Sequence, residues 1–89
     1  MKIKNGFILR EISGVNVVIG VGANAEKIKN SMVKLNESGA FIWKVLEKGA
    51  TVDEVVSALL NEYDAPEEVI RLDVENIIKT LKEIGAIDD

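Results

Sequence analysis

The sequence predicts a single α+β domain spanning residues 1–89, in which a three-stranded antiparallel sheet precedes three helices. Two observations carry this prediction. Apolar residues up to about residue 35 repeat with a period near two, which is typical of strands. From residue 36 to about residue 85 they recur with the period of an amphipathic helix. The order β-β-β-α-α-α, with a small sheet at one end of three helices, is winged-helix-like.

The strand region begins with a hairpin. Phe7–Ile12 has a repeat near two and Val15–Val21 is rich in β-branched residues, so each is predicted to be a strand. The Ser13-Gly14 pair between them is typical of a tight turn. The polar, glycine-bearing segment Gly22–Asn30 is predicted to be a loop, and Ser31–Leu35 a short third strand.

Capping residues mark the first two helices. Asn36 is a favoured N-cap, and Gly49 stands where a helix commonly ends in a left-handed residue. Thr51 followed by Glu54 forms a capping box that opens the second helix. The apolar stripe of the first helix is Phe41, Ile42, Val45 and Leu46, with Trp43 beside it as a core residue. The stripe of the second is Val52, Val55, Val56, Leu59 and Leu60.

The third helix is the longest. Pro66 fits its first turn, the helix is predicted to run to about Ile84, and Gly85 ends it. Its predicted inward stripe is spaced four, three, four and three: Ile70, Val74, Ile77, Leu81 and Ile84.

Composition argues against several functions. The chain has neither Cys nor His, so disulfides, thiolate zinc sites and the usual general base near neutral pH are all missing. We therefore predict a protein that is not an enzyme and that has no metal site and no cofactor. No apolar run approaches the roughly 20 residues needed to span a bilayer, and no signal peptide is evident. The expected location is cytoplasmic, without a membrane partner.

Charge divides the chain. Residues 1–35 carry six basic and two acidic side chains, whereas residues 36–89 carry five basic and thirteen acidic ones. The predicted third helix, counted from Glu67 to Glu83, has three basic side chains against five acidic ones. A helix that reads nucleic acid is expected to be basic, so no nucleic-acid partner is predicted.

An ordered set of short motifs is more specific. It consists of Leu35-Asn36, Ile42-Trp43, Gly49, Thr51-Val52 with Glu54, Asp73-Val74 and Leu81–Ile87. This set resembles the coenzyme PQQ synthesis protein D family, and the resemblance covers nearly the whole chain. Members of that family are precursor-peptide recognition domains, known as RiPP recognition elements, of pathways that make ribosomally synthesised and modified peptides.

The resemblance implies a peptide-binding adaptor. The leader of a precursor peptide would add as an extra strand beside the third strand and lie against the third helix. The partner would be a modifying enzyme, either a radical S-adenosylmethionine enzyme or a leader peptidase. The peptide-binding residues expected from this geometry are Ser31, Met32, Val33, Lys34, Ile70, Asp73, Val74 and Ile77.

Two alternatives stay open at this point. One is a nucleic-acid-binding winged helix, which the acidic third helix argues against. The other is a protein–protein module, including a homodimer that pairs through the same open strand edge. The sequence does not name the precursor peptide, the modifying enzyme or the product.

Overall fold

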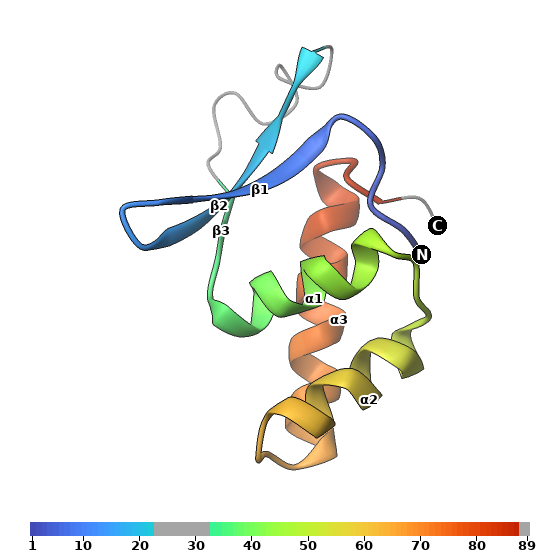
Figure 1. Ribbon diagram of the computed structural model, residues 1–89. Coiled ribbons are helices and arrows are strands. Elements are labelled where there is room, and N and C mark those ends of the chain that lie inside the picture. Colours follow the sequence, from blue (N-terminus) through green and yellow to red (C-terminus); the bar gives the residue numbers. More distant parts are fainter. Residues whose placement is uncertain (23–32, 88–89) are drawn as a thin grey trace.

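The computed structural model describes residues 1–22 and 33–87 and confirms the predicted α+β fold of three antiparallel strands followed by three helices (Figure 1). The sheet lies at one end of the helical part. The elements are β1 (Phe7–Ile12), β2 (Val15–Gly20), β3 (Val33–Leu35), α1 (Glu37–Glu47), α2 (Val52–Glu62) and α3 (Glu67–Glu83). No helix in these two ranges has the length and apolar character required to cross a bilayer.

β2 is the central strand of the sheet, and β1 and β3 form its two edges. Leu9 of β1 and Val33 of β3 both lie opposite Val18 of β2, in antiparallel pairing. Residues that face each other across strands share a face of the sheet, so these three side chains point the same way. This is the face that packs on the helices, because Val18 belongs to the hydrophobic core.

The hairpin turns where the sequence predicts. Ser13 and Gly14 have φ angles of 52° and 80°, the left-handed values that a two-residue type I′ turn requires. β3 is also present as predicted, over Val33–Leu35. The predicted strand residues Ser31 and Met32 lie outside the described residues.

α1 begins and ends at the predicted signals. The Asn36 side chain caps the helix because its Oδ1 accepts a hydrogen bond from the backbone N–H of Gly39 at 2.8 Å. Gly49 follows the helix with a φ of 89°. The fully buried side chains of α1 are Ile42, Trp43 and Leu46. Phe41 and Val45, which were predicted on the inward stripe, are only half-buried.

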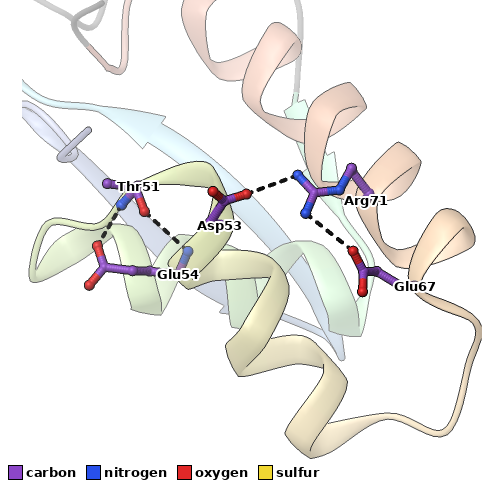
Figure 2. Close-up of polar contacts among 5 residues, drawn as sticks. All are labelled: Thr51, Asp53, Glu54, Glu67 and Arg71. Atoms are coloured by element: carbon purple, nitrogen blue, oxygen red, sulfur yellow. Dashed lines mark hydrogen bonds and ion pairs between the residues drawn. The ribbon is translucent and has the colours of Figure 1, made fainter.

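α2 opens with the predicted capping box, shown in Figure 2. The backbone N–H of Glu54 donates to Thr51 Oγ1 at 3.1 Å, and the backbone N–H of Thr51 donates to Glu54 Oε1 at 2.9 Å. The buried residues of α2 are Val55, Val56 and Leu59. Val52 and Leu60, at the ends of the predicted stripe, are half-buried.

α3 differs from the prediction in two details. Pro66 is the N-cap residue rather than part of the first turn, because its ψ of 144° is extended. Ile78, and not Ile77, continues the buried stripe. Both isoleucines fit a helical repeat after Val74, and packing selects the second one. Ile84, the last member of the predicted stripe, is half-buried.

A surface ion pair joins α3 to the start of α2. In Figure 2, the Arg71 guanidinium donates to Asp53 at 3.1 Å and to Glu67 at 3.4 Å. The hydrogen bonds to Asp53 and then to Glu67 raise the pKa of Arg71 above its ordinary value. The Asp53 side chain is 84% exposed, so solvent screens this pair.

The N-terminal segment pairs with a residue between α1 and α2 and with the residues that follow α3. Met1 and Ala50 exchange two hydrogen bonds of 2.8 Å, one from the N-terminal ammonium and one from the Ala50 backbone N–H. Lys4 N–H donates to the Ala86 carbonyl at 2.8 Å, and Ile3 forms an antiparallel bridge with Ile87. Nothing in the sequence predicted the pairing of residues 3–4 with residues 86–87, since these segments are more than eighty residues apart.

Candidate functional site

The candidate site lies where the edge strand β3 meets α1 and α3. β3 is hydrogen-bonded to β2 on one side and is the last strand of the sheet on the other. An edge strand of this kind presents backbone N–H and C=O groups that another strand can pair with. The position of β3 in the sheet therefore makes its outer edge the natural place for an added strand.

Gly39 of α1 is the junction that brings β3 and α3 close together. A Cβ placed on Gly39 would lie 3.1 Å from Leu35 Cβ and 3.3 Å from Ile77 Cδ1. The absence of a side chain at this position thus lets the end of β3 and the middle of α3 approach the same turn of α1. Ile77 is consequently beside the strand rather than in the centre of the core.

Asp73 fixes the next turn of α3 to the start of α1. The Ser38 hydroxyl lies 3.0 Å from Asp73 Oδ2 and also 3.0 Å from Asn36 Oδ1. Asp73 is half-buried. The sequence left open whether Asp73 sits at a groove rim or in solvent, and the structure places it against α1, one helical turn before Ile77.

One side of α3 therefore remains partly open beside this junction. Its residues are spaced four, three and four, and all four are half-buried: Asp73, Ile77, Thr80 and Ile84. We call this set the open stripe. The adjacent stripe of Ile70, Val74, Ile78 and Leu81 is buried in the core.

A shallow, mostly apolar pocket of about 380 Å³ extends the open stripe toward the start of α3. It is lined by Ser38, Leu59, Tyr63, Ala65, Val69, Ile70, Leu72, Asp73 and Asn76. Val69 and Leu72 are 58% and 61% exposed, the highest values among the large hydrophobic residues in the described part of the chain. Neither residue was among the predicted peptide-binding residues. Their signal was an apolar pair three positions apart on an otherwise charged face.

The predicted peptide-binding residues divide into three groups. Ser31 and Met32 lie outside the described residues. Val33 and Lys34 are on β3, half-buried and exposed respectively, and Asp73 and Ile77 belong to the open stripe. Ile70 is 6% exposed and Val74 is fully buried, so they support the open stripe from within the core.

The chain resembles known proteins both in sequence and in fold. The family model for Coenzyme PQQ synthesis protein D (PqqD) matches residues 20–87, which include β3 and all three helices. The chain belongs to the PqqD family. The resemblance seen in the sequence motifs is therefore confirmed. A search of curated proteins found no significant match to the chain.

Two solved structures share the fold of this PqqD-family chain. One is TbiB1 in complex with the TbiA(beta) leader peptide, with a TM-score of 0.71 and 24% identity over 100% of both chains. The other is lasso peptide synthetase B1 complexed with the leader peptide, with a TM-score of 0.72 and 19% identity. The second comparison covers 94% of this chain and 92% of that chain. At these identities the similarity establishes a common architecture.

Proposed function

We propose that this PqqD-family chain is a non-catalytic adaptor that binds the leader segment of a ribosomally made precursor peptide. The observation that carries the proposal is an edge strand, β3, that lies beside the open stripe of α3. The descriptions of the two similar structures as leader-peptide complexes support it. Binding would present the rest of the precursor to a modifying enzyme, either a radical S-adenosylmethionine enzyme or a leader peptidase.

The backbone of β3 supplies the first part of the affinity. A leader in extended conformation adds as an antiparallel strand and bonds to the backbone groups on the outer edge of Val33–Leu35. Three residues offer few such bonds, and each contributes only about 0.5–1.5 kcal/mol. Side chains must therefore provide most of the remaining affinity and the selectivity.

The open stripe and the apolar pocket provide those side-chain contacts. Ile77 lies directly beside the end of β3, and the pocket with Val69 and Leu72 continues from it along α3. Burying one Leu-sized side chain of the leader there contributes about 1.5–3 kcal/mol. The exposed Lys34 favours an acidic leader, and Asp73 offers a carboxylate to a donor on the peptide.

Presentation is the proposed mechanism. An adaptor that binds both the leader and the enzyme raises the effective concentration of the precursor at the enzyme, without itself making or breaking a bond. The chain has no His or Cys to serve as a general base or a nucleophile near neutral pH, which is consistent with this role.

A titration with the leader segment of a precursor peptide encoded beside this protein tests the proposal. We expect amide NMR shifts concentrated in Val33–Leu35 and in residues 69–84. Two leader peptides N-methylated at alternate backbone positions make a matched pair, because only one set of N–H groups can face β3. One peptide should lose binding and the other should retain it. Equal affinity of the two would exclude strand addition.

A protein variant complements the peptide pair. Val33→Pro removes one N–H from β3, so leader binding should weaken if that N–H faces the peptide. A thermal melt of the variant verifies that it is folded. If no leader produces shifts and the mass of the protein rises with concentration, the β3 edge instead forms a homodimer.

A further inference from the structure

A second concavity lies on another side of α1. It has a volume of about 700 Å³ and is formed by the β1–β2 hairpin, α1 and the end of α2. Its lining residues are Leu9, Glu11, Gly14, Asn16, Glu37, Ala40, Phe41, Lys44, Glu62 and Tyr63. We call it the hairpin cleft. It includes no residue of β3 or α3 and shares only Tyr63 with the lining of the apolar pocket, so the proposed leader-binding function does not account for the rest of the cleft.

α1 separates the hairpin cleft from the β3–α3 site. Glu37, Ala40, Phe41 and Lys44 are spaced three, one and three along the helix, which places them on one face. Ser38, which contacts Asp73, and Gly39, where an added Cβ would lie 3.3 Å from Ile77 Cδ1, are on other faces of the helix. A ligand in the hairpin cleft and a strand on β3 can therefore be bound at the same time.

The hairpin supplies one wall of the cleft. Leu9 shares the helix-facing side of the sheet with Val18, its partner in β2, and Glu11 and Asn16 lie opposite each other on that same side. The helices do not cover the part of the hairpin near its turn, where Ser13 and Gly14 are exposed. Leu9 and Asn16 are thus half-buried and Glu11 is exposed.

The floor of the cleft is aromatic. The rings of Phe41 and Tyr63 meet edge to face with 6.1 Å between centroids and an interplanar angle of 84°. Both residues are half-buried, so they leave apolar ring surface facing the cleft. Such a pair offers a firm platform for one aliphatic or aromatic side chain of a ligand.

The rim of the cleft is acidic. Glu11, Glu37 and Glu62 contribute three carboxylates, and Lys44 is the single basic residue of the lining. Within residues 1–22 and 33–87, none of the three carboxylates is held in a salt bridge. The rim thus attracts a cation, whereas the exposed Lys34 on β3 attracts an anion.

We infer that the hairpin cleft docks a basic segment of a partner protein, with one apolar side chain on the Phe41–Tyr63 pair and Arg or Lys side chains on the acidic rim. Apolar contact at the centre with charges around it is the usual anatomy of a protein interface. Because the charge preference is opposite to that of the β3 edge, the docked segment differs from the leader. The chain is then a two-sided adaptor, with one surface for the peptide and one for a protein.

Two short synthetic peptides test the inference. They share the same Leu and Phe residues, and one carries Arg where the other carries Glu. We expect the Arg peptide alone to bind and to shift the amides of residues 9–16, 37–44 and 62–63. Its affinity should fall as the salt concentration rises. Binding of both peptides alike, or shifts confined to residues 33–35 and 69–84, would overturn the inference.

Charge-matched variants of the protein sharpen the test. The triple variant Glu11→Gln, Glu37→Gln and Glu62→Gln should weaken binding of the Arg peptide roughly tenfold, since three exposed pairs are lost. Its control, Glu47→Gln, Glu75→Gln and Glu83→Gln, changes the net charge equally at exposed positions outside the cleft. If both variants bound the Arg peptide equally weakly, the overall charge of the protein would explain the effect. Specific binding in the hairpin cleft would then be contradicted.

The outcome is independent of the leader-binding proposal. A protein that binds the Arg peptide but no leader would retain the hairpin cleft as a docking site and lose the proposed function. A protein that binds the leader but not the Arg peptide would retain the proposed function and lose the hairpin cleft as a docking site.

Discussion

The two sides of α3 differ in how far the rest of the fold covers them. On one side are Ile70, Val74, Ile78 and Leu81, each exposed by 6% or less. On the other side is the open stripe of Asp73, Ile77, Thr80 and Ile84, each half-buried. Both sets repeat at helical spacing, so the position of α3 against its neighbours creates the difference. One helix thereby serves both the core and a surface, and substitutions on its two sides should separate stability from binding.

The largest effect is expected on the buried side. Leu81 is fully buried, and Leu81→Ala removes its contacts and leaves a cavity, so the free energy of unfolding should fall by about 2–5 kcal/mol. Urea denaturation measures the change. Lys79→Ala, an exposed substitution on the same helix, should stay within about 0.5 kcal/mol of the parent. If Leu81→Ala behaved like Lys79→Ala, the assignment of the two sides would be wrong.

The next largest effect is expected on binding. Leu72 is 61% exposed at the apolar pocket, so Leu72→Ala should leave the free energy of unfolding within about 0.5 kcal/mol. Affinity for the leader peptide should nevertheless fall roughly tenfold, or about 1.4 kcal/mol, because an apolar contact is lost. Calorimetric titration measures it, with Lys79→Ala again as the control. Loss of stability in parallel with affinity would show that the two sides are not separable.

A smaller effect is expected at the junction between the two regions. Gly39→Ala adds a Cβ at 3.1 Å from Leu35 Cβ and 3.3 Å from Ile77 Cδ1. Crowding costs about 1–3 kcal/mol and the gain in helix propensity offsets about 1 kcal/mol, so a net loss of about 1 kcal/mol is expected. Thermal denaturation measures it.

A substitution of Ile77 provides a control for the crowding expected at Gly39. Ile77→Val removes the Cδ1 atom that the new methyl group meets, so the double variant Gly39→Ala, Ile77→Val should be more stable than the sum of the single changes. Strict additivity would mean that the added methyl group does not crowd Ile77.

The smallest effect is expected at the surface ion pair. Arg71→Gln breaks the contacts with Asp53 and Glu67, which are exposed and screened, so the melting temperature should stay within experimental error. Hydrogen bonds to Asp53 and Glu67 raise the pKa of Arg71, so on the alkaline side its small contribution is lost only as the pH rises through that raised pKa, and Arg71 stays charged between about pH 6 and pH 8. The melting temperatures of parent and variant should therefore agree at about pH 6 and at about pH 8. A difference that appeared at one pH and not at the other would contradict this.

The elements of the candidate site could be predicted from the sequence, because they have local signals. β3 and α3 were expected to form it, and the structure brings Leu35 of β3 and Ile77 of α3 to the same turn of α1. The peptide-binding roles of Val33, Lys34, Asp73 and Ile77 stay predictions. Val69 and Leu72 were missed because they fall outside the inward stripe, and the pattern of the core gives no reason to select an apolar residue there. The hairpin cleft was also missed, since it joins residues from three elements that are distant in sequence.

The sequence by itself determined the hairpin, the caps of α1 and α2 and the amphipathic character of α3. Turn geometry, capping and helical periodicity act over a few residues, so the signals at Ser13-Gly14 and Thr51–Glu54 specify them locally. Only the tertiary structure decided that Ile78 enters the core while Ile77 stays beside β3. Both residues satisfy the same repeat, and the rotation of α3 that chooses between them is set by its contacts with α1 and α2, including the close approach at Gly39.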